Sequence, residues 1–84
     1  MNELSELRNI GKELERKLKV VGITTTEQLR QVGSQEAFIR VKAYYPNVCL
    51  VHLMAIEGAI SDMEYNHLPE DVQRSLKEFS DSLK

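Results

Sequence analysis

The stretch VCLVHLMAIEGAI, residues 48–60, decides the fold because ten of its thirteen residues are apolar. The apolar residues fall on every side of a helix drawn through the stretch, as they do in helices buried by their neighbours. These thirteen residues would cover only about 20 Å, which is too short for a bilayer core. His52 and Glu57 also interrupt the run. The stretch therefore predicts the central helix of a protein without a membrane-spanning segment. Within it, Ala55, Gly58 and Ala59 would let another helix approach closely.

Shorter helices are predicted on both sides of this central helix. No stretch alternates apolar and polar residues as a strand would, whereas apolar residues spaced by three and four recur along the chain. Glycine, proline and Ser or Thr caps divide the rest of the chain into segments at about 2–7, 12–20, 26–32, 34–45 and 69–83. We expect Ser34 to cap its segment, and either Thr24 with Glu27 or Thr25 with Gln28 to form a capping box. The sequence thus predicts an all-α fold over residues 1–84, a single compact bundle of five helices. Segment 2–7 is so short that a helix there would be only marginally stable on its own.

The composition excludes several function classes. A chain of 84 residues makes one small domain, so a two-domain enzyme is excluded. Eleven basic and thirteen acidic residues give a net charge of −2, which argues against broad electrostatic binding of nucleic acid. Cys49 is the only cysteine, so no intramolecular disulfide can form, and the charged N-terminal residues lack the apolar run of a secretory signal. We therefore expect a domain of the reducing cytoplasm.

The sharpest local signal is LRNIG, residues 7–11, followed by a helix and then by LKVVGI, residues 18–23. This spacing resembles the helix-hairpin-helix motif. Asn9 and Gly11 tolerate a left-handed backbone, so residues 7–11 predict a tight N-terminal hairpin. Such a hairpin would turn the free N–H groups of the next helix toward a phosphate.

A small basic stripe accompanies the N-terminal hairpin. Residues 1–33 hold six basic and five acidic side chains, and Arg8, Lys12 and Arg16 follow one another at intervals of one helical turn. Three phosphate contacts would give a salt slope of about −3, which means weak and non-specific DNA binding. The alternative is an ordinary solvated helix face. The candidate nucleic-acid residues are Arg8, Asn9, Gly11, Lys12 and Arg16.

The residues that could carry catalysis or bind a metal are too few for a site. Cys49 and His52 share a helical face, but zinc takes three or four protein ligands. Glu57 lies in the most apolar helix, where its pKa could be raised, or it reaches the helix surface or caps a backbone N–H near Leu68. We expect no catalytic residue, no metal and no cofactor, so the chain is not expected to be an enzyme.

A second mode of binding is association with a protein. Tyr44, Tyr45, Val48 and Val51 cluster beside Pro46, where two helices meet, and the candidate interface residues are Tyr44, Tyr45 and Val48. An exposed pair of tyrosines would suit a partner protein or a second copy in a homodimer. Alternatively, both tyrosines complete the small core.

The sequence also resembles the C-terminal domain of the TfoX (Sxy) competence-regulator family over about residues 4–83. The matching pieces are Leu7-Arg8-Asn9-Ile10-Gly11, Val21-Gly22-Ile23 with Thr25 and Leu29, residues 33–37, residues 53–59, and Tyr65 followed by Leu68-Pro69. The resemblance implies an all-helical domain related to DNA-binding hairpin modules. Such domains occur in proteins that promote natural transformation by acting with transcription factors. We therefore expect a non-catalytic module that regulates competence or transcription, bound weakly to DNA or to a transcription-related protein; the alternative is an adaptor that binds proteins and no nucleic acid.

Overall fold

The structure, a computed structural model, describes residues 4–83 and contains five α-helices and no strand within that range. The all-α prediction is therefore confirmed. The helices are α1 (Lys12–Val20), α2 (Thr26–Val32), α3 (Ser34–Tyr44), α4 (Leu50–Ser61) and α5 (Glu70–Ser82). Two short 3-10 turns, η1 (Leu4–Glu6) and η2 (Tyr65–His67), precede α1 and α5. Of the predicted segment 2–7, only η1 is helical among the described residues.

The helix α2 begins with the predicted capping box, in the register that starts at Thr25. The Thr25 hydroxyl accepts a hydrogen bond from the Gln28 backbone N–H at 3.1 Å. In return, the Gln28 side-chain oxygen accepts from the Thr25 backbone N–H at 3.3 Å. The same oxygen also accepts from the Thr24 backbone N–H at 2.7 Å. The two threonines thus share one glutamine, which fixes the start of α2.

The start of α3 differs from the prediction. A single residue, Gly33, separates α2 from α3, and its φ of 86° is one that glycine adopts without strain. Ser34 is therefore the first residue of α3 and makes no capping bond. Its hydroxyl instead donates to Oε1 of Glu57 in α4, at 2.6 Å. The prediction of a Ser34 cap is wrong because the turn is too short to place Ser34 ahead of the helix.

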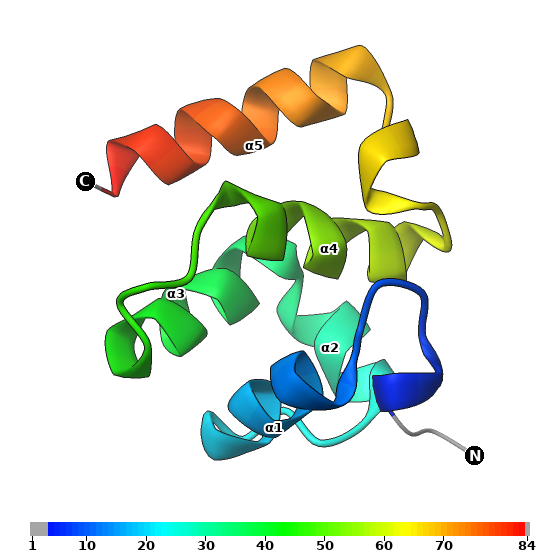
Figure 1. The fold of residues 1–84 in the computed structure, drawn as a ribbon, viewed down its shortest axis with the longest axis vertical. Helices are drawn as coiled ribbons and strands as arrows, with labels where there is room; N and C mark the ends of the chain where they lie inside the picture. Colours follow the sequence, from blue (N-terminus) through cyan, green and yellow to red (C-terminus); the bar gives the residue numbers. More distant parts are fainter. Residues whose placement is uncertain (1–3, 84) are drawn as a thin grey trace.

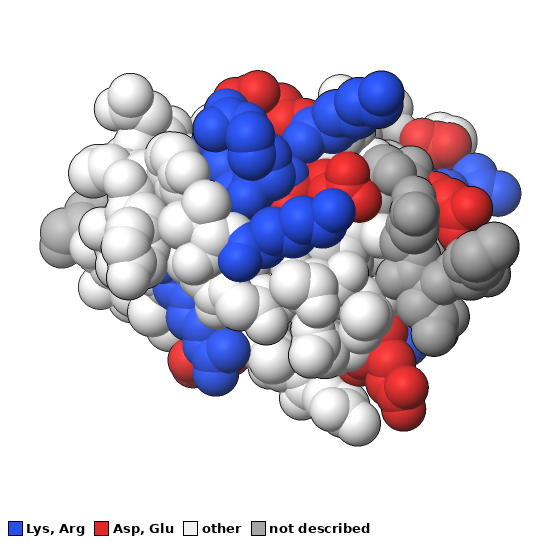
Figure 2. Space-filling model, turned by 90° about the horizontal axis from the view of Figure 1, so that it is seen from below, with Lys and Arg blue, Asp and Glu red and all other residues white. Residues whose placement is uncertain are grey.

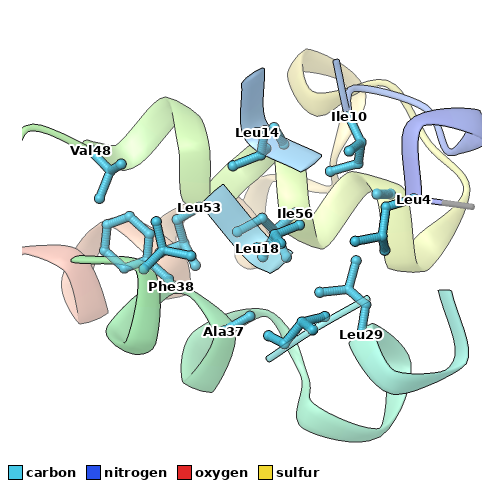
Figure 3. Packing of buried hydrophobic residues seen from close by; sticks show 14 of the residues in the cluster. Leu4, Ile10, Leu14, Leu18, Leu29, Ala37, Phe38, Val48, Leu53 and Ile56 are labelled. Carbon is cyan, nitrogen blue, oxygen red and sulfur yellow. The ribbon is translucent and has the colours of Figure 1, made fainter. Parts of the chain in front are cut away.

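The core lies around α4. In Figure 1, α4 runs through the middle, with α5 on one side and α1 and α2 on the other. Figure 3 shows Leu53 and Ile56 of α4 together with Leu18 of α1 and Phe38 of α3, and all four side chains are almost completely buried. The predicted central helix is thus confirmed, although it begins at Leu50 rather than at residue 48.

Two faces of the bundle are covered less completely. Val51 of α4, which the sequence placed both in the buried run and in the cluster with Tyr44, is 52% exposed. Of the apolar residues of α5, only Leu76 is buried, whereas Val72 and Phe79, and Leu83 just after the helix, are covered in part. No helix in the described part of the chain has the length and apolar content needed to cross a bilayer.

Candidate interaction surfaces

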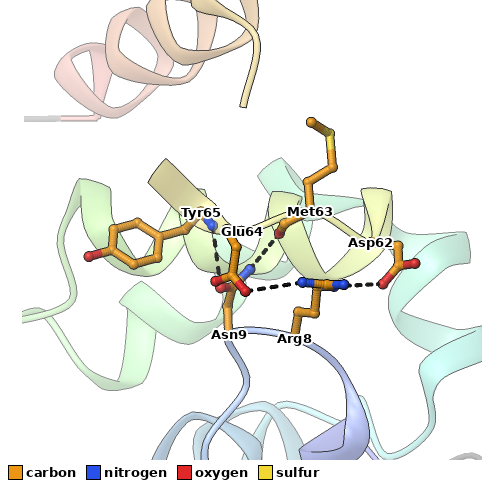
Figure 4. Close-up of polar contacts among 6 residues, drawn as sticks. All are labelled: Arg8, Asn9, Asp62, Met63, Glu64 and Tyr65. Atoms are coloured by element: carbon orange, nitrogen blue, oxygen red, sulfur yellow. Dashed lines mark hydrogen bonds and ion pairs between the residues drawn. The ribbon is translucent and has the colours of Figure 1, made fainter. Parts of the chain in front are cut away.

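The N-terminal hairpin is joined to the turn that follows α4. Asn9 has a left-handed φ of 68°, as predicted. Its side-chain Nδ2 donates to the Met63 carbonyl at 2.9 Å, and its Oδ1 accepts from the Tyr65 backbone N–H at 3.3 Å (Figure 4). Gly11, which could also tolerate a left-handed backbone, has a φ of −85° and does not use that freedom. Asn9 therefore uses both ends of its side-chain amide to fasten the hairpin to the turn after α4.

Gly58 on α4 makes room for this junction. A Cβ atom at Gly58 would lie 2.5 Å from Nδ2 of Asn9 and 2.6 Å from the Met63 carbonyl oxygen, which is closer than real side chains come. The close approach expected at Gly58 is confirmed. The approaching group, however, is the hairpin and the turn after α4 rather than another helix.

Arg8 is paired with two carboxylates beside the same junction. Its Nε lies 3.1 Å from Oδ1 of Asp62, and its Nη1 lies 3.1 Å from Oε1 of Glu64 (Figure 4). The hydrogen bond and charge of Asp62, followed by the charge of Glu64, raise the pKa of Arg8 above its ordinary value. Two negative charges thus balance this side chain. The sequence held no local sign of them because they lie 54 and 56 residues away.

The remaining candidate nucleic-acid residues, Gly11, Lys12 and Arg16, lie at or on α1. Gly11 caps α1 without a side-chain hydrogen bond, Arg16 is paired with Glu13, and Lys19 lies 3.8 Å from Glu15. Lys12 is exposed and has no ion pair with any residue in the range 4–83. Figure 2 accordingly shows Lys and Arg side chains with Asp and Glu side chains between them. The stripe is a surface of mixed charge in which Lys12 is the cation left open by the described residues.

The predicted protein interface is only partly exposed. Tyr44 is 67% exposed, whereas Val48 is 2% exposed and belongs to the core. Tyr45 is half-buried against the core, with Nζ of Lys17 lying 5.3 Å from its ring centre. Val48 is therefore wrong as an interface residue because the turn before α4 folds it inward, and Tyr45 is largely used in packing.

Tyr44 has exposed apolar neighbours that the sequence did not indicate. Val20 at the end of α1 is 50% exposed, and Ile39 on α3 is 40% exposed. The three residues border one hollow of about 600 Å³, and we call them the Tyr44 patch. Val20 and Ile39 were missed because each lies outside the inward face of its own helix, where an isolated apolar residue is common.

A larger hollow, of about 710 Å³, lies between α3 and α5, and we call it the α3–α5 groove. Its apolar lining comprises Val32, Ile39, Val72, Leu76 and Phe79, and its acidic lining comprises Glu36, Glu57 and Asp71. Glu57 accepts hydrogen bonds from the hydroxyls of Ser34 at 2.6 Å and of Ser61 at 3.2 Å. Of the alternatives for Glu57, the cap of a backbone N–H near Leu68 is wrong, whereas the side chain does reach the surface at the α3–α5 groove. The side chain that contacts the backbone at Leu68 is Gln73, whose Nε2 donates to the Leu68 carbonyl at 2.6 Å.

Cys49 and His52 form a local contact at the start of α4. The Cys49 backbone N–H donates to Nδ1 of His52 at 3.1 Å, and the Cys49 sulfur lies 3.6 Å from the same nitrogen. Burial, followed by the positive charge of Lys17, lowers the pKa of His52. Within residues 4–83, no group of three or more His, Cys, Asp or Glu side chains is arranged to hold a metal ion.

Comparisons with known proteins show the family of the chain. Residues 1–80 match the TfoX C-terminal domain, and no curated protein matches the chain. Two similar crystal structures come from Listeria monocytogenes: an uncharacterized protein in a triclinic form and a protein of unknown function in a tetragonal form. Both are 44% identical, with a TM-score of 0.95. The first match covers 99% of this chain and 93% of the Listeria chain, and the second covers 98% and 100%. Because the family match extends over nearly the whole sequence, the chain belongs to the TfoX C-terminal domain family.

Proposed function

We propose that this TfoX C-terminal domain is a non-catalytic interaction module that binds a protein through the Tyr44 patch, in the regulation of competence or transcription. The carrying observation is that Val20, Ile39 and Tyr44 expose 50%, 40% and 67% of their surfaces around one hollow. Single exposed apolar residues are ordinary, but a contiguous group with an aromatic residue is typical of a binding surface. A hollow beside a tyrosine also gives a partner a place to insert an apolar side chain.

The pairing of the hairpin cations favours protein over DNA as the main partner. Arg8 is held by Asp62 and Glu64, and Arg16 is held by Glu13. A phosphate would have to compete with these carboxylates for the guanidinium groups, and their negative charges would repel it. The Tyr44 patch involves no such competition.

Photo-crosslinking in the native host tests this proposal. A benzophenone amino acid would replace Tyr44, and the matched control would carry it at Glu78, an exposed residue of α5. We expect a protein adduct at position 44 that is absent at position 78 and strongly reduced by Val20→Glu. The mass of the adduct distinguishes a second copy of the chain from a different protein. Equal adducts at both positions, or an adduct that Val20→Glu leaves unchanged, would contradict the proposal.

A second candidate function is weak contact with DNA phosphates at the start of α1. Lys12 has no ion pair with a described residue, and the N-cap Gly11 leaves the first N–H groups of α1 without a side-chain acceptor. Both features attract an anion. This candidate needs only Lys12 and the helix end, not the paired arginines.

Titration of duplex DNA at several low salt concentrations tests this second candidate. Lys12→Ala should weaken binding and reduce the salt slope by about 1, as expected for the loss of one phosphate contact. Lys77→Ala removes one positive charge from α5 and should leave the slope unchanged. If no DNA binds, or if the two variants behave alike, phosphate contact at α1 is rejected.

A further inference from the structure

The α3–α5 groove combines an apolar lining with a deficit of positive charge. Ile39 from α3 and Val72 and Phe79 from α5 line it, and the two α5 residues are only partly covered by the core. In Figure 1, α5 lies along one side of α4, away from α1 and α2. The packing of α5 on α4 therefore leaves part of its apolar face open toward α3.

The charged groups that line the groove are all acidic. Glu36, Glu57 and Asp71 line it, and no Lys, Arg or His belongs to its described lining. Glu36 is paired with Arg40 at 3.0 Å. Within residues 4–83, Glu57 is bound by two serine hydroxyls and by no cation, and Asp71 has no ion pair.

This arrangement favours a ligand that is both cationic and apolar. Several like charges beside a low-dielectric wall attract positive charge and repel phosphate. The two hydroxyl donors hold the carboxylate of Glu57 in place, so a guanidinium could pair with it at little cost in ordering. A volume of about 710 Å³ is within the range that binds a few side chains.

We propose that the α3–α5 groove docks a cationic amphipathic segment of a partner protein. Arg or Lys side chains of this segment pair with Glu57 and Asp71, and its apolar side chains cover Val72 and Phe79. A second copy of the chain is a poor occupant. The helix that carries the most basic residues is α1, and its apolar residues Leu14 and Leu18 are already buried in its own core. The groove adjoins the Tyr44 patch at Ile39 but is otherwise lined by different residues, and it suits a different partner chemistry.

The probe is a labelled helical peptide with Leu on one face and Arg beside it. An analogue with Glu in place of every Arg serves as the control peptide. Binding is followed by fluorescence anisotropy at low and moderate salt, and backbone NMR shifts locate the peptide on the domain. We expect shifts at the groove, weaker binding at higher salt, and no binding of the acidic analogue.

Charge-removing variants decide whether the carboxylates act as proposed. Glu57→Gln and Asp71→Asn should each raise the dissociation constant about tenfold, as expected for a hydrogen bond between charged groups. Glu78→Gln removes an exposed carboxylate of α5 outside the groove and should change it less than about twofold. The amide introduced by Glu57→Gln can accept from one serine hydroxyl through its oxygen and donate to the other through its NH2 group. This variant should therefore keep its fold, and circular dichroism checks this.

The contrary outcomes are equally specific. If all three variants bind the peptide alike, the groove carboxylates do not select it and the inference fails. If binding survives Asp71→Asn but is lost in Val20→Glu, the peptide occupies the Tyr44 patch, which overturns this inference and leaves the proposed function standing. If sedimentation shows a dimer that Asp71→Asn dissociates, the groove holds a second copy and the inference is wrong.

Discussion

Gly58 is a residue at which one added methyl group should be costly. Gly58→Ala would place a Cβ 2.6 Å from the Met63 carbonyl, and a backbone atom cannot swing aside as the end of a side chain can. Although alanine favours helix, we expect a net loss of about 1 to 3 kcal/mol in the free energy of unfolding. The measurement is urea denaturation followed by circular dichroism.

Gly11→Ala is the matched control for this prediction. A Cβ at Gly11 meets nothing within 4 Å, and the φ of −85° suits alanine. The reduced freedom of the unfolded chain and the weaker N-cap should nearly cancel, leaving a change under about 0.5 kcal/mol. Similar losses in the two variants would show that close approach is not what requires glycine at position 58.

Asn9 should be sensitive for two separable reasons. Asn9→Ala removes the hydrogen bonds to Met63 and Tyr65 and also places alanine at a φ of 68°. We expect a loss of about 2 to 4 kcal/mol. Asn9→Gly removes the same bonds but relaxes the backbone, so about 1 to 2 kcal/mol should be lost. Chemical denaturation of both variants gives the order, and equal losses would mean that the left-handed backbone contributes nothing.

Residues near the hairpin show what local sequence can and cannot reveal. The left-handed backbone of Asn9 could be predicted because it depends on the intrinsic tolerance of asparagine. The partners of Asn9 and Arg8 could not, because they lie on the turn after α4 and are brought near only by tertiary packing. Arg8 was thus a reasonable phosphate ligand in the sequence, and in the structure it is paired with two carboxylates.

At the scale of the element, α1 has one face that the core depends on. Leu18 has no exposed surface, so Leu18→Ala should cost about 2 to 5 kcal/mol in unfolding free energy through the cavity it leaves. Val20→Ala, two residues along the same helix, shortens a side chain that is 50% exposed and should cost less than about 1 kcal/mol. Denaturation curves for the pair provide the test. A shift for Leu18→Ala no larger than that for Val20→Ala would mean that α1 packs by another face.

The bounds of the helices were predictable where the signals that set them are local. The segments 12–20 and 26–32 agree with α1 and α2, because charge pairs, glycines and the capping box all lie within a few residues. At the start of α3 the local signal misled. Ser34 is a good N-cap residue in isolation, but Gly33 alone makes the turn, and the Ser34 hydroxyl is used by α4.

At the scale of the whole molecule, stability should depend on pH through His52. Burial, and then the charge of Lys17, hold the pKa of His52 below its ordinary value of about 6.5. At pH values just below about 6.5, His52 is protonated in the unfolded chain but not in the folded chain. The free energy of unfolding should therefore fall as pH drops through about 6.5, until the folded-state pKa is reached, and be unaffected above both values.

Comparison with His52→Gln isolates this effect from the carboxylates. The glutamine oxygen can still accept from the Cys49 backbone N–H, which replaces the bond made by Nδ1 of His52. Urea denaturation between about pH 5 and pH 8 should give a shallower pH dependence for the variant in the lower part of that range. Parallel curves for the two proteins would mean that His52 has the same pKa folded and unfolded.

The candidate surfaces were less predictable than the fold because they are assembled from several helices. Tyr44 could be found from its sequence setting, but Val48, in the same cluster, is buried by the turn before α4. The acidic lining of the α3–α5 groove draws one residue from each of three helices: Glu36, Glu57 and Asp71. No window of sequence contains all three, so only their packing reveals the groove.

The hydrogen bond between Asn9 and Tyr65 cannot form until most of the chain has been synthesised. These residues are 56 positions apart, so at about 5–20 residues per second a ribosome takes roughly 3 to 11 s to add the second after the first. Until then Arg8 has neither Asp62 nor Glu64 to pair with, and the hairpin has nothing to close against. The hairpin, which leaves the ribosome early, therefore cannot close against its partners until the turn after α4 has been made.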